Sequence, residues 1–505
     1  MLYNENRNYI KRVNNMRDFI INKGILEKYR GSGGNVMIPD NVIGIGESAF
    51  CDCETLISVT VPESVTYIES YAFSECKNLT KVELPNSVTH IGREAFCYCL
   101  KLKDIKLPYH LTEISENLFR NCTSLNKILI PESVERIAYG AFCGCSSLDF
   151  ILIPKNVQKI EQKAFADCTG IDGIFTDLDS EHFRSLNGVL YSKDLTEIVL
   201  FPAGKKGAFY ISDKVSEFDT EVLKGITGLT EIQVSENSEK YASVDGVLFN
   251  KELSTLIAFP AGRSGTYCVP ESVTCIADSA FKNCKKLTKI TLPEGLEYIG
   301  PDAFTNCSGL QHLFEVPESV TWLGISAFQG CSGLTRIILP SGLSHIMMST
   351  FYRCSSLRII QIPESVEIIE ENAFSDCTSL TEITIPSNVK SIFSDAFWDC
   401  SSLTDIYFKG NNPFVISADE RYRLNHYKPF GWDMVFTAHY PKGNPTWRKS
   451  RQRKYGAKYI SWVEWDPEDA AVPDLNEVGI RRYARVTANK AKTLLTEVKE
   501  RVHKE

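Results

Sequence analysis

Apolar residues recur along the chain with a period of 23 residues. A proline opens each unit, and apolar residues follow it at constant offsets in the pattern P-x-x-V-x-x-I-x-x-x-A-F-x-x-C-x-x-L-x-x-I-x-L. Two runs carry these prolines, with one 24-residue step before Pro317: Pro39, Pro62, Pro85, Pro108, Pro131 and Pro154, then Pro270, Pro293, Pro317, Pro340, Pro363 and Pro386. Because no unit of this length can bury its apolar face alone, the pattern predicts a solenoid.

Alternation within a unit predicts a short strand before each proline. In the peptide LTKVELP we expect Leu79, Val82 and Leu84 to face the core, and Lys81 and Glu83 to face solvent. The proline then removes a backbone donor and ends the strand. The strands of successive units should therefore run parallel and stack at about 4.7–4.9 Å.

The same repeat accounts for most of the cysteines. Twelve of the 17 occupy one slot, three residues after the repeat phenylalanine: Cys53, Cys76, Cys99, Cys122, Cys145, Cys168, Cys284, Cys307, Cys331, Cys354, Cys377 and Cys400. We interpret this slot as a ladder of structural thiols, since free cysteine behaves as a small hydrophobe. Disulfides and zinc stay open as alternatives. Parallel side chains fit disulfide geometry poorly, however, and no histidine cluster completes a zinc site.

The unit resembles the BspA-like class of leucine-rich repeats, in which L-x-x-I-x-L-P is followed by V-x-x-I-x-x-x-A-F-x-x-C. One unit fills these slots with Leu79, Val82, Leu84, Pro85, Val88, Ile91, Ala95, Phe96 and Cys99. The likeness spans about residues 18–465, with Leu118 and Thr350 in place of the repeat alanine. It implies a curved array of parallel β-strands with short turns or helical segments. It also implies protein binding, often as a bacterial surface adhesin, and it carries over no catalytic residue.

The breaks in the repeat divide the chain. We predict a polar N-terminal segment (1–17), an N-terminal cap with a first array (18–169), an irregular repeat and hairpin region (170–267), a second array (268–409), a C-terminal cap (410–465), and a linker with an amphipathic helix (466–505). In the irregular region GVLYSKDLTEIVLFPAG returns 58 residues later as GVLFNKELSTLIAFPAG. We read this echo as a hairpin module that starts or restarts a stack, and a hinge between the arrays is the alternative.

The C-terminal part departs from the repeat. Trp447, Tyr455, Tyr459, Trp462 and Trp465 are expected to cap the solenoid end. A basic cluster, Arg448, Lys449, Arg451, Arg453 and Lys454, is interpreted as the solvated side of a capping helix, or alternatively as a site for an anionic partner. A helix from about Leu475 to Val502 could dock on this chain, on a partner or on a second copy.

Charge and motifs exclude several functions. The net charge of −8 argues against a general nucleic-acid binder, and no run reaches the length of a membrane span. No metalloprotease, phosphate-loop or hydrolase-elbow motif occurs, so we expect no enzyme, cofactor or metal. The polar N-terminal stretch lacks an export signal and predicts a cytoplasmic protein, whereas the family resemblance implies a surface or secreted one.

The outward strand positions offer candidate ligand-binding residues. Apolar side chains stand there at Leu129, Phe150, Leu152, Ile338, Ile359 and Tyr407, on a face that should otherwise be wet. Exposed apolar groups often mark an interface. The sequence therefore predicts a non-enzymatic module that binds a protein or glycan through its strand face, with an intracellular scaffold as the alternative.

Overall fold

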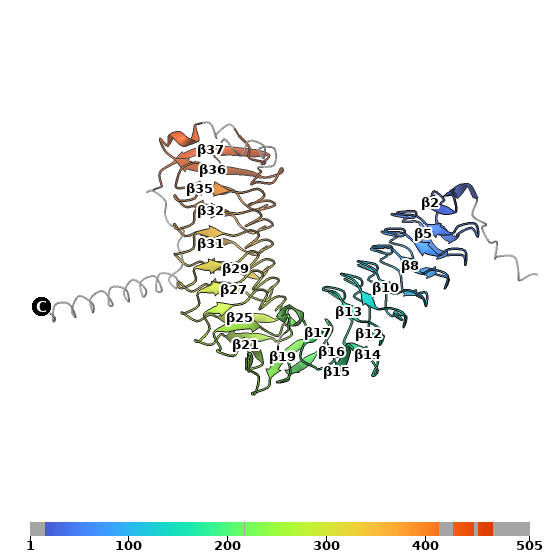
Figure 1. The fold of residues 1–505 in the computed structure, drawn as a ribbon. Coiled ribbons are helices and arrows are strands. Elements are labelled where there is room, and N and C mark those ends of the chain that lie inside the picture. The colour runs from blue at the N-terminus through green and yellow to red at the C-terminus, as the bar shows by residue number, and fades with distance from the viewer. Residues whose placement is uncertain (1–15, 217, 414–427, 449–452, 468–505) are drawn as a thin grey trace, which may run out of the picture.

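The computed structural model describes residues 16–216, 218–413, 428–448 and 453–467, which form a solenoid of stacked turns. Figure 1 shows two straight stacks that meet at a bend between β15 (Phe183–Leu186) and β19 (Leu229–Val234). The predicted repeat solenoid of parallel strands is confirmed. The described helical segments are short 3-10 helices: Met16–Asp18, Thr220–Leu223 and Pro445–Trp447. The amphipathic helix predicted from about Leu475 to Val502 lies outside the described residues.

Most turns, or rungs, place one strand just before the repeat proline, although the rung that ends at Pro131 has none there. We call the outward side of these strands, and of the equivalent segment before Pro131, the strand face. In the first array and at the bend they are β3 (Gly34–Met37), β5 (Leu56–Thr60), β7 (Lys81–Glu83), β9 (Asp104–Ile105), β12 (Phe150–Ile153), β14 (Gly173–Thr176), β18 (Gly207–Ile211) and β19. In the second array they are β23 (Gly265–Cys268), β25 (Leu287–Thr291), β27 (His312–Glu315), β29 (Leu334–Ile338), β31 (Ile359–Gln361), β33 (Glu382–Ile385) and β35 (Asp405–Phe408). Neighbouring strands pair in parallel, 23 residues apart where the repeat is regular, as Val59 does with Val82.

A second set of two-residue strands follows each proline and builds the other side of the rung. It comprises β4 (Gly44–Ile45), β6 (Tyr67–Ile68), β8 (His90–Ile91), β10 (Glu113–Ile114), β11 (Arg136–Ile137), β13 (Lys159–Ile160), β24 (Cys275–Ile276), β26 (Tyr298–Ile299), β28 (Trp322–Leu323), β30 (His345–Ile346), β32 (Ile368–Ile369) and β34 (Ser391–Ile392). In every one of these strands the second residue is the repeat isoleucine or leucine. The two sets enclose a narrow apolar core.

The repeat phenylalanines form a stack along the axis of each array. In the first array, Tyr29 and then Phe50 through Phe165 lie at centroid distances of 4.9–5.7 Å with nearly parallel rings. In the second array the stack runs from Phe259 to Phe430 at 5.0–5.9 Å. Offset stacking of this kind contributes about 0.5–1.5 kcal/mol per pair beyond the buried area.

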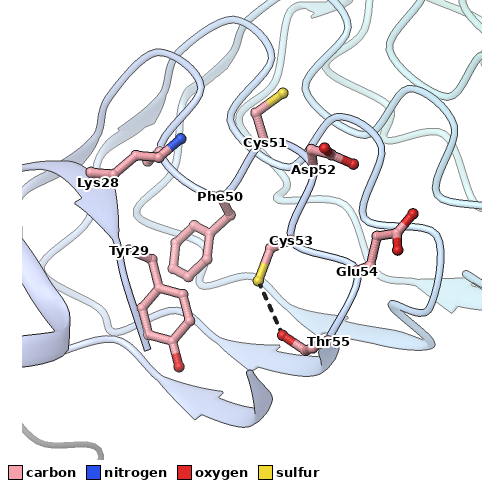
Figure 2. Close-up of a pocket in the computed structure, with 9 residues that line it drawn as sticks. Lys28, Tyr29, Phe50, Cys51, Asp52, Cys53, Glu54 and Thr55 are labelled. Carbon is pink, nitrogen blue, oxygen red and sulfur yellow. Dashed lines mark hydrogen bonds between the residues drawn. The ribbon is translucent and has the colours of Figure 1, made fainter. Parts of the chain in front are cut away.

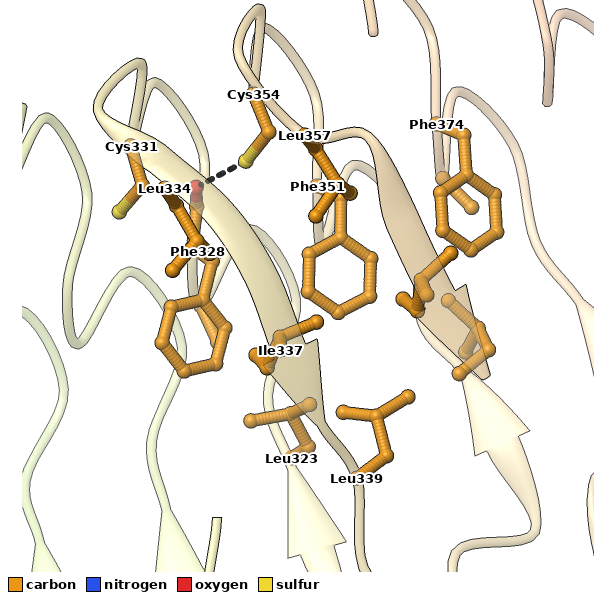
Figure 3. Packing of buried hydrophobic residues seen from close by; sticks show 14 of the residues in the cluster. Leu323, Phe328, Cys331, Leu334, Ile337, Leu339, Phe351, Cys354, Leu357 and Phe374 are labelled. Atoms are coloured by element: carbon orange, nitrogen blue, oxygen red, sulfur yellow. Dashed lines mark hydrogen bonds between the residues drawn. The ribbon is translucent and has the colours of Figure 1, made fainter. Parts of the chain in front are cut away.

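The cysteine ladder makes one recurrent hydrogen bond between rungs. The thiol of Cys354 donates to the carbonyl of Phe328 in the preceding rung at 3.1 Å, as Figure 3 shows. The same contact, 2.9–3.2 Å long, is made by Cys76, Cys99, Cys122, Cys145, Cys168, Cys307, Cys331, Cys377 and Cys400. Each of these phenylalanine carbonyls thereby satisfies a buried donor of the next turn. The first ladder cysteine of each array has a different partner. Cys53 contacts the Thr55 hydroxyl, and Cys284 contacts the carbonyl of Lys282.

The turn that carries the alanine–phenylalanine pair needs two residues with positive φ per rung, four positions apart. Asn117 and Asn121 hold φ angles of 51° and 59°, and Gly140 and Gly144 follow them in the next rung. Asparagine and glycine accept this left-handed conformation at low cost, whereas other L-residues pay roughly 1–2 kcal/mol. In the rung before, Glu94 and Tyr98 occupy the same two positions, so packing on both sides must hold them there.

A hairpin module precedes the second array, as the sequence echo predicted, and another hairpin precedes the first array. β1 (Phe19–Asn22) pairs antiparallel with β2 (Ile25–Tyr29), and β2 then pairs in parallel with β4. In the irregular region β20 (Tyr241–Val244) and β21 (Val247–Asn250) form a hairpin, and β21 pairs with β22 (Thr255–Ala258), which leads in parallel into β24. The earlier echo forms a similar meander of β15, β16 (Val189–Ser192) and β17 (Ile198–Leu200).

The C-terminal cap differs from the expected capping helix. β36 (Val435–Pro441) and β37 (Tyr459–Trp465) continue the sheet of β33 and β35 in parallel. Trp447 is fully buried and packs at a tilt against Phe408 and Trp462, with ring centroids 4.8 and 5.7 Å away. The described part of the basic cluster, Arg448, Arg453 and Lys454, is exposed beside these strands. The cap therefore closes the core with aromatic rings and two further strands.

Replacing a buried ladder cysteine should destabilise the protein. Cys354→Ala removes a buried thiol and leaves the Phe328 carbonyl without that donor, so we expect a loss of about 1–2 kcal/mol in the free energy of unfolding. The exposed Cys268 provides the matched control, whose change to alanine should stay within about 0.5 kcal/mol. Urea denaturation measures both free-energy changes, provided that the dependence of the unfolding free energy on urea concentration is the same for each variant. Equal midpoints for the two variants would contradict a structural role for the ladder.

The ladder also predicts a loss of stability in alkali. Burial raises the pKa of Cys168 to about 12 and raises those of Cys99, Cys331 and Cys354 well above the ordinary value. The unfolded chain releases these protons above pH ~8.5 while the folded chain keeps them, so the stabilisation present below that pH is lost as the pH rises. Each buried thiol contributes up to about 1.4 kcal/mol per pH unit.

Urea midpoints measured from pH 7 to 10 test this sign. The wild-type midpoint should fall steeply above pH ~8.5, and a variant with Cys331, Cys354 and Cys377 changed to alanine should fall less steeply. Because lysines and tyrosines are common to both proteins, only the thiols account for the difference. Parallel curves would refute the linkage.

Candidate binding surface on the strand face

Two columns of outward side chains run along the strand face, two and four residues before the proline position. The register pairs Met37 with Thr60 and Thr60 with Glu83, so equivalent residues are direct neighbours. Apart from Met37, which is 56% exposed, these columns are polar or charged through the first rungs: Asn35, Ser58, Thr60, Lys81, Glu83, Asp104, Lys106 and Lys127. From Leu129 to Phe175 the exposed side chains in these columns are instead mainly apolar.

An apolar patch covers the end of the first array. Leu129 is 73% exposed, Phe150 54% and Leu152 44%. Leu152 pairs directly with Phe175 of β14, which is 46% exposed. We call these four residues the strand-face patch. The structure therefore brings three of the predicted residues together and adds Phe175.

The lack of a side chain at Gly173 leaves room for the Phe175 ring. Gly173 pairs with Phe150, and a Cβ atom there would lie 2.8 Å from two atoms of the Phe175 ring. The ring thus lies over the glycine, next to Phe150, where a side chain would otherwise stand. The absence of a side chain at Gly173 makes the patch continuous.

A hairpin tip borders this patch on the side of the bend. The carbonyl of Gly188 accepts a hydrogen bond from Ile174 N–H at 2.8 Å, in the place where the next strand would pair. Lys205 Nζ donates to the Asn187 carbonyl and ties the tip down. Leu186, half exposed, precedes this turn. Lys106 and Lys127 therefore border the patch at one end. The hydrogen-bonded turn at Asn187 and Gly188 borders it at the other.

Sequence reasoning missed Phe175 because Asp177 replaces the repeat proline there. The signal was nevertheless present, since Phe175 follows Leu152 by 23 residues. Counting the register past the last proline of the first array would have included it.

The second-array candidates form two separate groups. Ile338 pairs with Gln361 and Ile359 pairs with Arg336, so the two isoleucines are diagonal neighbours. Ile359 is 47% exposed and Ile338 is half-buried. The six predicted residues therefore do not make one surface.

Tyr407 lies near the C-terminal cap and is half-buried. Its ring stacks on His439 at a centroid distance of 4.2 Å and meets Trp465 edge-on at 5.1 Å. His439 Nε2 lies 2.8 Å from Asp405 Oδ1. Burial, together with Asp405 and Glu382, raises the pKa of Tyr407. Because its partners already surround it, Tyr407 serves the packing of the cap more than an open surface.

A hollow of about 400 Å³ opens at the N-terminal end of the core, where the ladder begins. Figure 2 shows Cys51 and Cys53 in its wall with their sulfur atoms pointing apart. Lys28 Nζ donates to the carbonyl of Ser48 at 3.2 Å. The two thiols are not placed as a redox pair, and the hollow contains no nucleophile paired with a base.

The thiols and carboxylates of the described ranges show no metal-binding arrangement. All 17 cysteines lie in these ranges and all are free, and no group of three or more His, Cys, Asp or Glu residues there could hold an ion. Likewise, no helix in the described part of the chain has the length and apolar character that crossing a bilayer requires.

The family model described as the BspA type leucine rich repeat region (6 copies) matches residues 43–172, 151–257, 265–347 and 312–417. These matches cover well over half of the chain. The protein is therefore a leucine-rich repeat solenoid, and it belongs to the BspA-type family.

Several solved structures are similar over most of their length. A leucine rich cell surface protein from Faecalibacterium prausnitzii is 26% identical, with 81% of this chain and 95% of that one covered and a TM-score of 0.39. A leucine-rich repeat protein from Bacteroides ovatus is 22% identical, with 83% and 99% covered and a TM-score of 0.33. The pneumococcal vaccine antigen PcpA is 21% identical, with 88% and 92% covered and a TM-score of 0.36.

No curated protein matches the chain. Since the TM-scores of the solved structures are below 0.5, family membership rests on the repeat model.

Proposed function

We propose that this protein is a non-enzymatic interaction module that binds a protein ligand through its strand-face patch. The observation that carries the proposal is a run of exposed apolar side chains on three successive rungs: Phe150 and Leu152 of β12, Phe175 paired with Leu152, and Leu129, which precedes Leu152 by one 23-residue repeat. Exposed apolar clusters of this kind are typical of protein interfaces, and aromatic rings are enriched at their centres.

The strand itself does not require these apolar residues. Polar residues such as Ser58, Thr60, Lys81 and Glu83 occupy the same columns a few rungs earlier, in strands β5 and β7, which also pair in parallel. An apolar run at one place on an otherwise polar face therefore needs a separate reason. A protein ligand fits the four apolar side chains better than a glycan does, because they offer no hydrogen-bond groups for hydroxyls.

Two settings are compatible with such a module. Membership of the BspA-type family supports a surface protein with an adhesin-like role. The free cysteines support an intracellular scaffold instead, because reducing compartments preserve thiols and oxidising ones threaten them. Self-association through residues 466–505 belongs to the same proposal, although those residues lie almost wholly outside the described ranges.

Photo-crosslinking tests the binding surface. We expect a photoreactive residue at position 150 to yield a discrete protein adduct in extracts or on cells of the source, which excess unmodified protein abolishes. Competition by a Leu129→Glu, Leu152→Glu double variant should be at least tenfold weaker, because two buried charges cost several kcal/mol at an interface core.

Met37→Glu is the matched control, since Met37 is 56% exposed on β3, in the same outward column as Leu129 and Leu152, and lies rungs away from the patch. Its competition should equal that of the wild type. The proposal fails if the double variant competes as well as the control does.

Protease shaving of intact source cells separates the two settings. A surface protein should be lost from unbroken cells, whereas an intracellular scaffold should be cut only after lysis. Immunoblotting with a cytosolic marker provides the control for leakage. Protection in intact cells would count against the adhesin-like role while leaving the binding surface itself open to the crosslinking test.

A further inference from the structure

Arg336 stands on the strand face of the second array, in a row with two apolar neighbours. In the paired register Leu313 of β27 precedes it and Ile359 of β31 follows it. Leu313 is 36% and Ile359 47% exposed, so both border the surface around the guanidinium. Ile338, two residues along the same strand, is the fourth member of this group, which we call the arginine row.

The Arg336 guanidinium lacks the partner that such a group normally has. Its Nη2 atom is buried and makes no hydrogen bond within the described residues. Arg353 and Arg136 show the usual pairing, Arg353 with Asp376 at 3.2 Å and Arg136 with Glu113 and Glu161 at 2.7 and 2.9 Å. None of the ion pairs among the described residues includes Arg336.

A buried, charged N–H without an acceptor is unfavourable. Because Arg336 as a whole is only half-buried, a rotation of its side chain toward an incoming acceptor would relieve that cost. The guanidinium is planar and offers a fork that matches a carboxylate in two hydrogen bonds. Leu313 and Ile359 on either side would exclude water from such a contact, which strengthens it. The arginine row could therefore bind a ligand in which an anionic group lies between apolar groups.

We propose that the arginine row recognises a carboxylate of a protein partner, from an aspartate, a glutamate or a chain end, flanked by apolar side chains. This inference rests on the proposed function, because it assigns partner chemistry to the same strand face. A peptide is the occupant that the apolar flanks favour. An acidic glycan would place hydroxyl groups against Leu313 and Ile359.

Methyl NMR of the full chain, labelled at isoleucine δ1, tests the proposal with two peptides. The acidic probe is acetyl-Leu-Glu-Ile-amide, and the neutral one carries glutamine in place of glutamate. We expect the acidic probe to shift the Ile338 and Ile359 signals in a saturable way, with affinity about tenfold above that of the neutral probe. Ile338→Val and Ile359→Val assign the two signals.

Arg336→Gln should abolish the difference between the probes, while Arg353→Gln, which removes an arginine from the turn side, should preserve it. The buried Ile337 and Ile360 signals report whether each variant keeps the fold. Arg336→Lys provides a second folded variant, which should retain part of the preference because the charge remains but the fork is lost.

Equal shifts with both probes, no shift with either, or a preference that survives in Arg336→Gln would each overturn the carboxylate assignment. Glucuronate shifting both signals as strongly as the acidic probe would overturn the peptide as partner. These outcomes are distinct from failure of the proposed function, which is decided at the strand-face patch by crosslinking at position 150.

Discussion

The contact on which the structure depends is the one between successive rungs at the phenylalanine turn. A thiol donates to the phenylalanine carbonyl of the rung before, while the two phenyl rings stack beneath it. Both interactions join nearest neighbours only. A solenoid built in this way gains its stability rung by rung, and each rung covers the apolar surface that its neighbour would otherwise expose.

The same constraint explains where the solenoid bends. The phenyl stack ends at Phe165 and starts again at Phe259, and the thiol–carbonyl contacts stop and resume with it. Between them a separate apolar cluster that includes Phe209, Phe218 and Tyr241 fills the core. Loss of the regular ladder thus coincides with the change of direction seen in Figure 1, and the strand-face patch lies just before it.

Much of this could be predicted from the chain alone, because the fold depends on a period. The 23-residue spacing predicted the solenoid and the inward ladder of cysteines, and the echo within the irregular region predicted the hairpin that precedes the second array. The crosslinked or metal-bound alternatives could be weighed against the parallel geometry of stacked strands. The thiol–carbonyl bond itself depends on the turn geometry and could not be read from spacing.

The parts that sequence reasoning missed are those where the period fails or where geometry decides. Phe175 was hidden by the aspartate that replaces a proline, and Gly173 acts through the ring that lies over it. β36 ends at Pro441, but neither it nor β37 keeps the 23-residue spacing or the repeat cysteine, so their continuation of the sheet was not expected. Arg336 is conspicuous only because, in the folded chain, its Nη2 atom is buried without a hydrogen-bond partner.

The most direct test of this account is a count of free thiols in protein purified without reductant. In denaturant all 17 cysteines should react, because the ladder consists of thiols. In the native state Cys268 should react first, the four half-buried cysteines more slowly, and the twelve buried ones only on the timescale of unfolding. Fewer than 17 reactive thiols in denaturant would show that ladder cysteines are crosslinked and would contradict the account.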